Sequence, residues 1–140
     1  MPEQKPVLVT PSGSLQTSGS QTSGMIRQNA LVNVCPDICA SRMIAKPHTS
    51  SAIHHHGPEN TIVFAFSGHG TIVSEGGKKK QHLAPGDFAL IPAWAEHQEV
   101  NESDEDVVWA IVRSGEEPVV VNLEGGWGSS FDGEGEGEKK

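Results

Sequence analysis

The stretch of sequence that decides the fold is residues 51–61, SAIHHHGPENT, which is followed by the apolar run IVFAF at 62–66. A run so rich in β-branched and aromatic residues favours a strand. If the extended backbone begins at the histidines, side chains alternate between faces, so His54 and His56 share one face and His55 lies on the other. Two imidazoles on one face can hold a divalent metal ion. The alternative is a loop of three surface histidines, whereas the internal position and the non-histidine neighbours disfavour a cloning tag.

Length, charge and hydropathy limit the class of protein. The chain of 140 residues suits one domain with one hydrophobic core, and its formal charge is −8. Lys78–Lys80 is the one local basic cluster, so the chain lacks a basic stripe for phosphate backbones and nucleic-acid binding is disfavoured. No apolar run has the length of a signal-peptide core or of a membrane span. We therefore expect a soluble cytoplasmic protein that binds a small-molecule substrate and neither nucleic acid nor a membrane.

The strand and turn signals predict a single all-β domain between two segments of low complexity. Residues 1–24 are rich in serine and glycine and are expected to be disordered, and residues 124–140, rich in glycine and glutamate, are expected to form a flexible tail. Between them, residues 25–123 contain short apolar runs separated by glycine and proline turns, with no segment of helical periodicity. This pattern is typical of a closed barrel or a sandwich. We predict strands at 25–34, 38–46, 61–66, 71–74, 88–91, 107–112 and 118–123.

The spacing of histidine, glycine and proline residues resembles that of the small single-domain cupins. That family has a first motif, Gly-x5-His-x-His-x3or4-Glu-x6-Gly, and a second motif, Gly-x5-Pro-x-Gly-x2-His-x3-Asn. The positions that keep this spacing are His54, His56, Gly68, Gly86, Pro92, His97 and Asn101. The resemblance extends over about residues 25–123. It implies a double-stranded β-helix, the cupin jelly-roll barrel, in which three histidines converge inside the barrel mouth.

The chain departs from the cupin motifs at three positions. Thr61 stands where the family has its glutamate ligand, Trp94 replaces the second glycine of the second motif, and His48 replaces the opening glycine of the first. The nearest carboxylate is Glu59, which we predict as a fourth metal ligand or as a catalytic base beside the metal; a surface loop residue is the alternative. The family includes dioxygenases with three histidines and no carboxylate. Such a site is more electropositive and favours an anionic or enolate ligand.

The metal ligands implied by the resemblance are His54, His56 and His97, with Glu59 as the candidate fourth. His97 could otherwise be a hydrogen-bonded surface histidine. Further residues are predicted to line the substrate pocket. Thr61 and Val63 share one face of a regular strand, and Trp94 could form a flat wall or be a core or rim aromatic. Arg42 could anchor a substrate carboxylate, although a surface ion pair is the commoner role for such an arginine.

The resemblance implies a divalent metal ion (Fe, Mn, Ni or Zn) and an enzyme that acts on an enol, a diketone or a carboxylate. The three-histidine arrangement inclines the prediction toward a dioxygenase. A metal-dependent isomerase or decarboxylase, with Glu59 moving the proton, is the alternative reaction. A cupin that binds metal or ligand without turnover is a second class of function. A DNA-binding regulator is disfavoured because the sequence lacks a helix-turn-helix segment. We also expect a homodimer, formed by packing of sheets or by exchange of residues 25–34.

Overall fold

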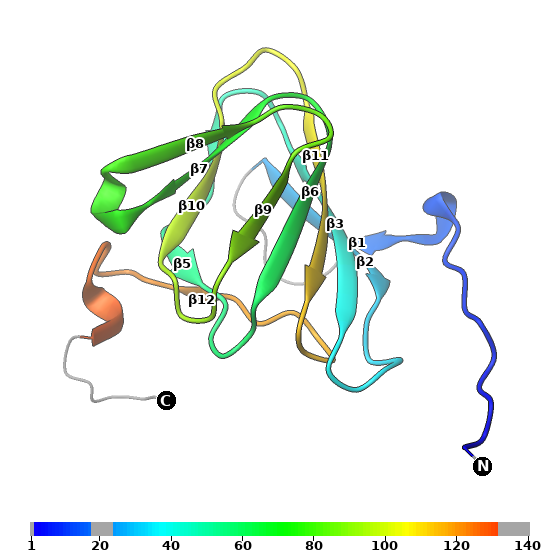
Figure 1. Cartoon of the computed structure of the whole chain (residues 1–140). Coiled ribbons are helices and arrows are strands. Elements are labelled where there is room, and N and C mark those ends of the chain that lie inside the picture. Colours follow the sequence, from blue (N-terminus) through cyan, green and yellow to red (C-terminus); the bar gives the residue numbers. More distant parts are fainter. Residues whose placement is uncertain (1, 18–23, 132–140) are drawn as a thin grey trace.

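The computed structural model describes residues 2–17 and 24–131 of the chain (Figure 1). Residues 1, 18–23 and 132–140, which belong to the two predicted low-complexity segments, lie outside the described part. The described residues contain short 3-10 turns at Ser12–Ser14, Glu75–Gly77 and Ser129–Phe131 and no α-helix. Their strands are β1 (Gln16–Thr17), β2 (Met25–Leu31), β3 (Cys39–Ala45), β4 (Thr49–Ser50), β5 (His54–His55), β6 (Thr61–Ser67), β7 (Gly70–Ser74), β8 (Lys79–Leu83), β9 (Phe88–Ile91), β10 (His97–Asn101), β11 (Val107–Arg113) and β12 (Val121–Asn122).

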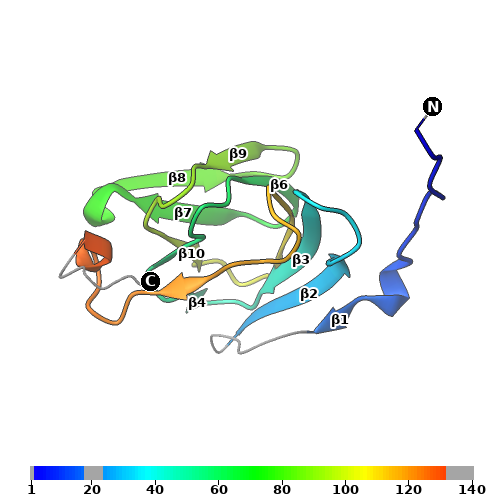
Figure 2. The ribbon, with the colours of Figure 1, turned by 90° about the horizontal axis from the view of Figure 1, so that it is seen from below.

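The strands form two antiparallel sheets that face each other across one interior (Figures 1 and 2). The first sheet has the order β1-β2-β3-β11-β6-β9, and the second has the order β12-β5-β10-β7-β8, with β4 paired to β10. Neighbours such as β3 and β11 are distant in sequence, as expected for a jelly roll and not for a simple meander. The predicted all-β jelly-roll barrel is therefore confirmed. In the described part of the chain, no helix is long and apolar enough to cross a membrane.

The core follows from the two-residue period of the strands. In β6 the side chains of Thr61, Val63 and Ala65 are buried, and those between them face outward. β11 repeats this alternation and places Trp109 in the centre of the barrel, 1% exposed. The buried apolar cluster consists of Met25, Met43, Ala45, Val63, Ala65, Ile72, Leu83, Ile91, Val107, Trp109 and Ile111.

Two predicted segments differ from the structure. The predicted strand at 118–123 is reduced to the two-residue β12, and β8 forms at 79–83, where no strand was predicted. β8 pairs along its length with β7, but its first four side chains are exposed and polar, so it lacks the alternating pattern by which strands are recognised. Phe66 and Phe88 lie on the outer face of the first sheet and are 67% and 70% exposed.

Two residues that replace cupin motif glycines have the left-handed backbone conformation that favours glycine. The motif glycine Gly68 has φ +79°, and a Cβ there would clash with the Asp106 carbonyl and with Val107. His48 and Trp94, which replace two other motif glycines, still have φ of +56° and +66°. A left-handed conformation costs a side-chain-bearing residue about 1–2 kcal/mol. The turns are therefore set by the pairing of the strands, which holds these two residues in a disfavoured conformation.

The motif asparagine Asn101 ties three segments together at the end of β10. Its buried Nδ2 donates to the carbonyls of Ala45 (2.9 Å), Lys46 (3.1 Å) and Glu105 (2.7 Å). Its Oδ1 accepts hydrogen bonds from the backbone N–H and the hydroxyl of Ser103, at 2.9 and 2.7 Å. The side chain thus joins the end of β3 to the β10–β11 turn.

We expect Asn101→Ala to lower the free energy of unfolding by about 2–4 kcal/mol, because the substitution leaves buried carbonyl groups without a donor. Urea unfolding followed by tryptophan fluorescence measures the change. Glu102→Ala, at the exposed neighbouring position, serves as the control and should stay within about 0.5 kcal/mol of the wild type. An equal effect of the two substitutions would contradict the structural role of Asn101.

Candidate metal centre

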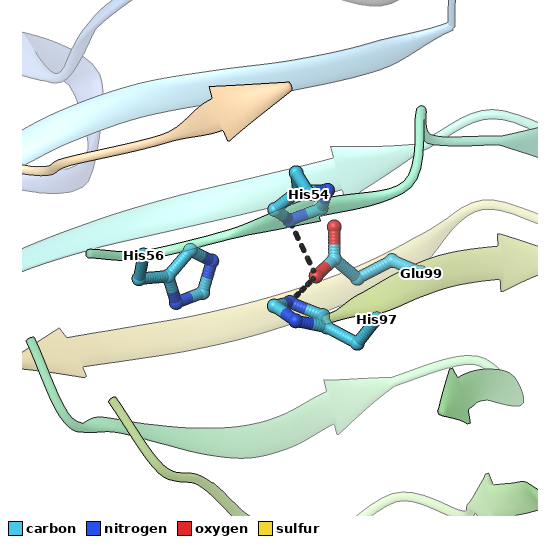
Figure 3. A group of neighbouring side chains, drawn as sticks. All are labelled: His54, His56, His97 and Glu99. Atoms are coloured by element: carbon cyan, nitrogen blue, oxygen red, sulfur yellow. Dashed lines mark ion pairs between the residues drawn. The ribbon is translucent and has the colours of Figure 1, made fainter. Parts of the chain in front are cut away.

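Four buried or nearly buried side chains converge inside the barrel: His54, His56, His97 and Glu99 (Figure 3). One potential ligand atom of each lies within 4.8 Å of those of the others. His54 belongs to β5 and pairs directly with His97 of β10, so the register between two short strands brings the first imidazoles together. The two-residue period of extended backbone adds the other two side chains, because residues 54 and 56 share one face of their segment and residues 97 and 99 share one face of β10.

Backbone carbonyls fix which nitrogen of two histidines is available. The Nδ1 atoms of His54 and His97 lie 2.8 and 2.9 Å from the carbonyl oxygens of Ala52 and Ala95. A carbonyl can only accept, so each Nδ1 carries the hydrogen and each neutral ring keeps its lone pair on Nε2. His56 Nδ1 lies 2.8 Å from the Thr61 hydroxyl, which orients the third ring. Partners of this kind hold metal-binding histidines in the correct tautomer and orientation.

The charge state of the group suits a cation. Burial alone would raise the pKa of the Glu99 carboxyl, but His54 and His97 hold that pKa well below its usual value. Burial, together with the charges of Arg113 and His97, lowers the pKa of His56 to about 2. For His54, burial is outweighed by the Glu99 carboxylate, which raises the pKa. The group therefore combines a carboxylate anion with at least one firmly neutral imidazole, the forms that bind metals.

Interatomic distances within the group fit a divalent ion. Glu99 Oε2 lies 2.8 Å from His97 Nε2 and 3.3 Å from His54 Nε2. Metal–ligand bonds of about 2.0–2.2 Å separate neighbouring ligand atoms by about 3 Å. His97 Nε2 is buried and faces this carboxylate oxygen. A lone pair facing a carboxylate oxygen is repulsive unless a proton or a cation lies between them, so three nitrogens and one oxygen form a fitting donor set for Fe, Mn, Ni or Zn.

Glu59, the carboxylate predicted from the sequence, is not brought into this group. It is buried elsewhere, where its Oε1 accepts a hydrogen bond from the Val119 N–H at 3.0 Å and lies 3.9 Å from Arg113 Nη1. The carboxylate that sequence reasoning missed is Glu99. The signal that could have found it is spacing, because Glu99 stands two residues after His97 and an extended backbone there places both side chains on one face.

The predicted pocket residues divide between three places. Thr61 and Val63 line a cavity of about 80 Å³ at the centre of the barrel, whereas Arg42 lies on the other face of β3 and donates to Gln28 Oε1 at 2.9 and 2.8 Å. Trp94 is 56% exposed, contacts His55 and lines a separate groove of about 930 Å³ beside β8 and β9. The remaining residues around the central cavity are Met25, Arg27, Met43, Ser51, His54, His56, Ile91, Glu99, Trp109, Ile111, Arg113 and Val120.

Comparison with known proteins agrees with the barrel and its motifs. Residues 41–113, more than half of the chain, match the family described as the cupin domain (Cupin_2). The chain belongs to the cupin family. Gentisate 1,2 dioxygenase 1 of Aquipseudomonas alcaligenes is 28% identical to this cupin over 79 residues, which are 56% of this chain and 22% of that protein. The matched part of this cupin thus spans about a fifth of the length of that relative.

Two solved structures illustrate the fold of this cupin. The polyketide cyclase RemF from Streptomyces resistomycificus superposes with a TM-score of 0.68 at 15% identity, covering 86% of each chain. A protein described as a predicted oxalate decarboxylase from Thermotoga maritima has a TM-score of 0.66 at 19% identity, covering 77% of this chain and 99% of its own. At such identities the likeness is one of fold alone, and the two names show how different cupin activities can be.

Substitution of the two glutamates tests which carboxylate helps to bind the metal: Glu99, which lies beside the histidines in the structure, or Glu59, which was predicted from the sequence. We expect Glu99→Gln to weaken Mn²⁺ or Zn²⁺ binding by at least about tenfold, because an amide removes the negative charge next to the three imidazoles. Glu59→Gln is the matched control and should leave the metal affinity close to that of the wild type. Isothermal titration of the metal into each protein gives the comparison. A larger loss in Glu59→Gln than in Glu99→Gln would support the sequence prediction instead.

Proposed function

We propose that this cupin is a metal-dependent enzyme acting on a small oxygenated metabolite. The observation that carries the proposal is the convergence of His54, His56, His97 and Glu99, with two Nε2 lone pairs directed by backbone carbonyls. These four residues would hold one divalent ion of Fe, Mn, Ni or Zn. When bound, the ion supplies Lewis-acid or redox chemistry to the oxygen atoms of an enol, a diketone or a carboxylate.

The residues of the chain would orient the ligands and exclude water. Thr61 holds the His56 ring through its hydroxyl and at the same time lines the cavity. Val63, Trp109 and Ile111 also line the cavity, and such apolar side chains lower the local dielectric and strengthen polar interactions with a bound substrate. The cavity thus combines polar and apolar lining residues, as small-molecule sites usually do.

A dioxygenase is the reaction class that we favour, supported by the sequence relative named as a gentisate 1,2-dioxygenase. An isomerase or decarboxylase is the second candidate, supported by Glu59. Burial raises the pKa of its carboxyl although the Val119 N–H and Arg113 act in the opposite direction, and such a group is suited to carrying a proton. Glu59 accepts a hydrogen bond from Val119 and does not belong to the group of His54, His56, His97 and Glu99. Its catalytic role therefore stays a prediction.

The first test is the metal content of the protein purified without chelators. We expect close to one equivalent of a divalent metal in the wild type and its loss in His56→Ala, because that substitution removes one of the four ligands. His69→Ala, at an exposed position outside the group, is the matched control and should keep the metal. Iron would direct assays to dioxygen consumption with enols and diketones, and zinc or nickel to isomerase and lyase assays.

Two results of this test count against the proposal. Wild-type protein that contains no metal, and that binds none on titration, would contradict the metal-dependent function. Tight metal binding without turnover of any enol, diketone or carboxylate would favour a cupin that binds metal or ligand without catalysis.

We also propose that this cupin is a homodimer. The outer face of β6 and β9 exposes Ile62, Phe66, Phe88 and Leu90, which are 48–70% exposed although apolar. A contiguous apolar face of this kind is unusual on a monomer and typical of an interaction surface. A second copy of the chain could cover it by packing sheet against sheet, which buries the phenylalanine side chains of both subunits.

Charge placed on this face should separate the subunits. We expect the double substitution Phe66→Glu, Phe88→Glu to convert a dimer into a monomer in sedimentation at micromolar concentration, because burying two carboxylates in an apolar interface is costly. Lys79→Glu, on β8 of the other sheet, is the control and should leave the dimer intact. A wild-type protein that sediments as a monomer of 14.9 kDa would refute the prediction.

A further inference from the structure

Arg113 is a buried cation that does not belong to the candidate metal-binding group, so metal binding does not explain why it is buried. It is the last residue of β11 and continues the inward-facing series of that strand after Trp109 and Ile111. The residue is 4% exposed and lines the same cavity as His54, His56 and Glu99. A guanidinium thus lies in the wall of the candidate active site.

The contacts of Arg113 leave part of its hydrogen-bonding capacity unused. Nη1 donates to the Val119 carbonyl at 2.8 Å, and Nε is buried without a hydrogen-bond partner among the described residues. A guanidinium has five N–H donors, and a buried charge is costly unless it is paired and hydrogen-bonded. Arginine nevertheless stays protonated in proteins. The side chain is therefore short of acceptors in a place where water has little access.

Neither nearby carboxylate neutralises this cation completely. Glu59 Oε1 lies 3.9 Å from Arg113 Nη1, beyond hydrogen-bond distance, and already accepts a hydrogen bond from Val119. Glu99 lies against His54 and His97, and a metal ion held by these residues would take up its charge. With the ion in place, the cavity has an excess of positive charge at Arg113.

The size of the cavity limits what can balance this charge. Its volume of about 80 Å³ exceeds the roughly 30 Å³ share of a water molecule in the liquid. It is smaller than the roughly 150 Å³ of a protein cavity that takes up benzene. The cavity therefore has room for a carboxylate group and its neighbouring atoms, and its open side leaves space for the rest of a larger molecule.

We propose that Arg113 binds the carboxylate of the substrate, and that this cupin acts on a carboxylic acid with an oxygen on the neighbouring carbon. A planar guanidinium matches a carboxylate in shape and charge, and the second oxygen then faces the His54, His56, His97 and Glu99 group. That the acid is a substrate rests on the proposed function, but its binding at Arg113 can be measured separately. Arg113 thereby takes the role that the sequence suggested for Arg42.

The test compares pyruvate with pyruvamide, its neutral analogue of nearly equal size, by calorimetric titration. Titrations are made with metal-loaded protein and with metal-free protein. In the metal-loaded wild type, pyruvate should bind about tenfold to a hundredfold more tightly than pyruvamide, the range expected for a hydrogen-bonded charge pair. Arg113→Gln should reduce this preference to about threefold or less. Arg42→Gln removes an arginine from the outer face of the barrel and should retain the preference of the wild type.

The outcomes separate this inference from the proposed function. A preference for pyruvate that depends on Arg113 in a protein that takes up no metal would support the carboxylate site and contradict the metal-dependent function. Equal binding of pyruvate and pyruvamide to a metal-loaded wild type would overturn the carboxylate site and leave the metal centre standing. Because this comparison uses the wild-type protein, it does not depend on the stability of Arg113→Gln. An equal loss of preference in Arg42→Gln would also overturn the assignment.

Discussion

The register between β5 and β10 is the constraint on which the candidate site depends. His54 lies directly opposite His97, and no other residue pair joins these two strands. A shift of one residue would turn every side chain of the shifted strand to the other face. The contact of β10 with β7, over four residue pairs, fixes its position, and the buried Asn101 holds its end. The short two-residue strand that carries His54 therefore takes its geometry from longer, better-anchored neighbours.

The carboxylate of the group has a different origin from that in the family motif. Thr61 occupies the glutamate position of the first motif and supports His56 through a hydrogen bond in place of a ligand. Glu99, from the strand of the second motif, supplies the charge instead. Both arrangements place one carboxylate near three imidazoles, because two neighbouring strands direct alternate side chains into the same interior. A carboxylate can therefore accompany the three histidines whether it comes from the strand of the first motif or, like Glu99, from the strand of the second.

The sequence predicted the barrel and the three histidines well because both depend on local patterns. Strand alternation, the turn glycines and the histidine spacing are visible within a few residues. Contacts between distant residues were harder to predict. Glu59, the nearest carboxylate in sequence, contacts Val119, and Arg42, a candidate for the pocket or for a surface contact, donates to Gln28 on the outer face of β3. Arg113 was overlooked because an arginine at the end of an apolar strand shows no sign of its burial until β11 is aligned with β3 and β6.

The segment that follows the barrel contributes to the wall of the cavity. The Val119 N–H donates to Glu59 and the Val119 carbonyl accepts from Arg113, so both of these buried side chains contact the backbone of one residue in this segment. Val120 then forms part of the cavity wall, and β12 continues along β5, at the lower end of the barrel (Figure 1). The candidate ligands belong to the barrel, whereas part of the cavity wall comes from a connection outside it. Cupins that share the barrel can thus differ in substrate, since a change in such a connecting segment alters the cavity without altering the strands that carry the ligands.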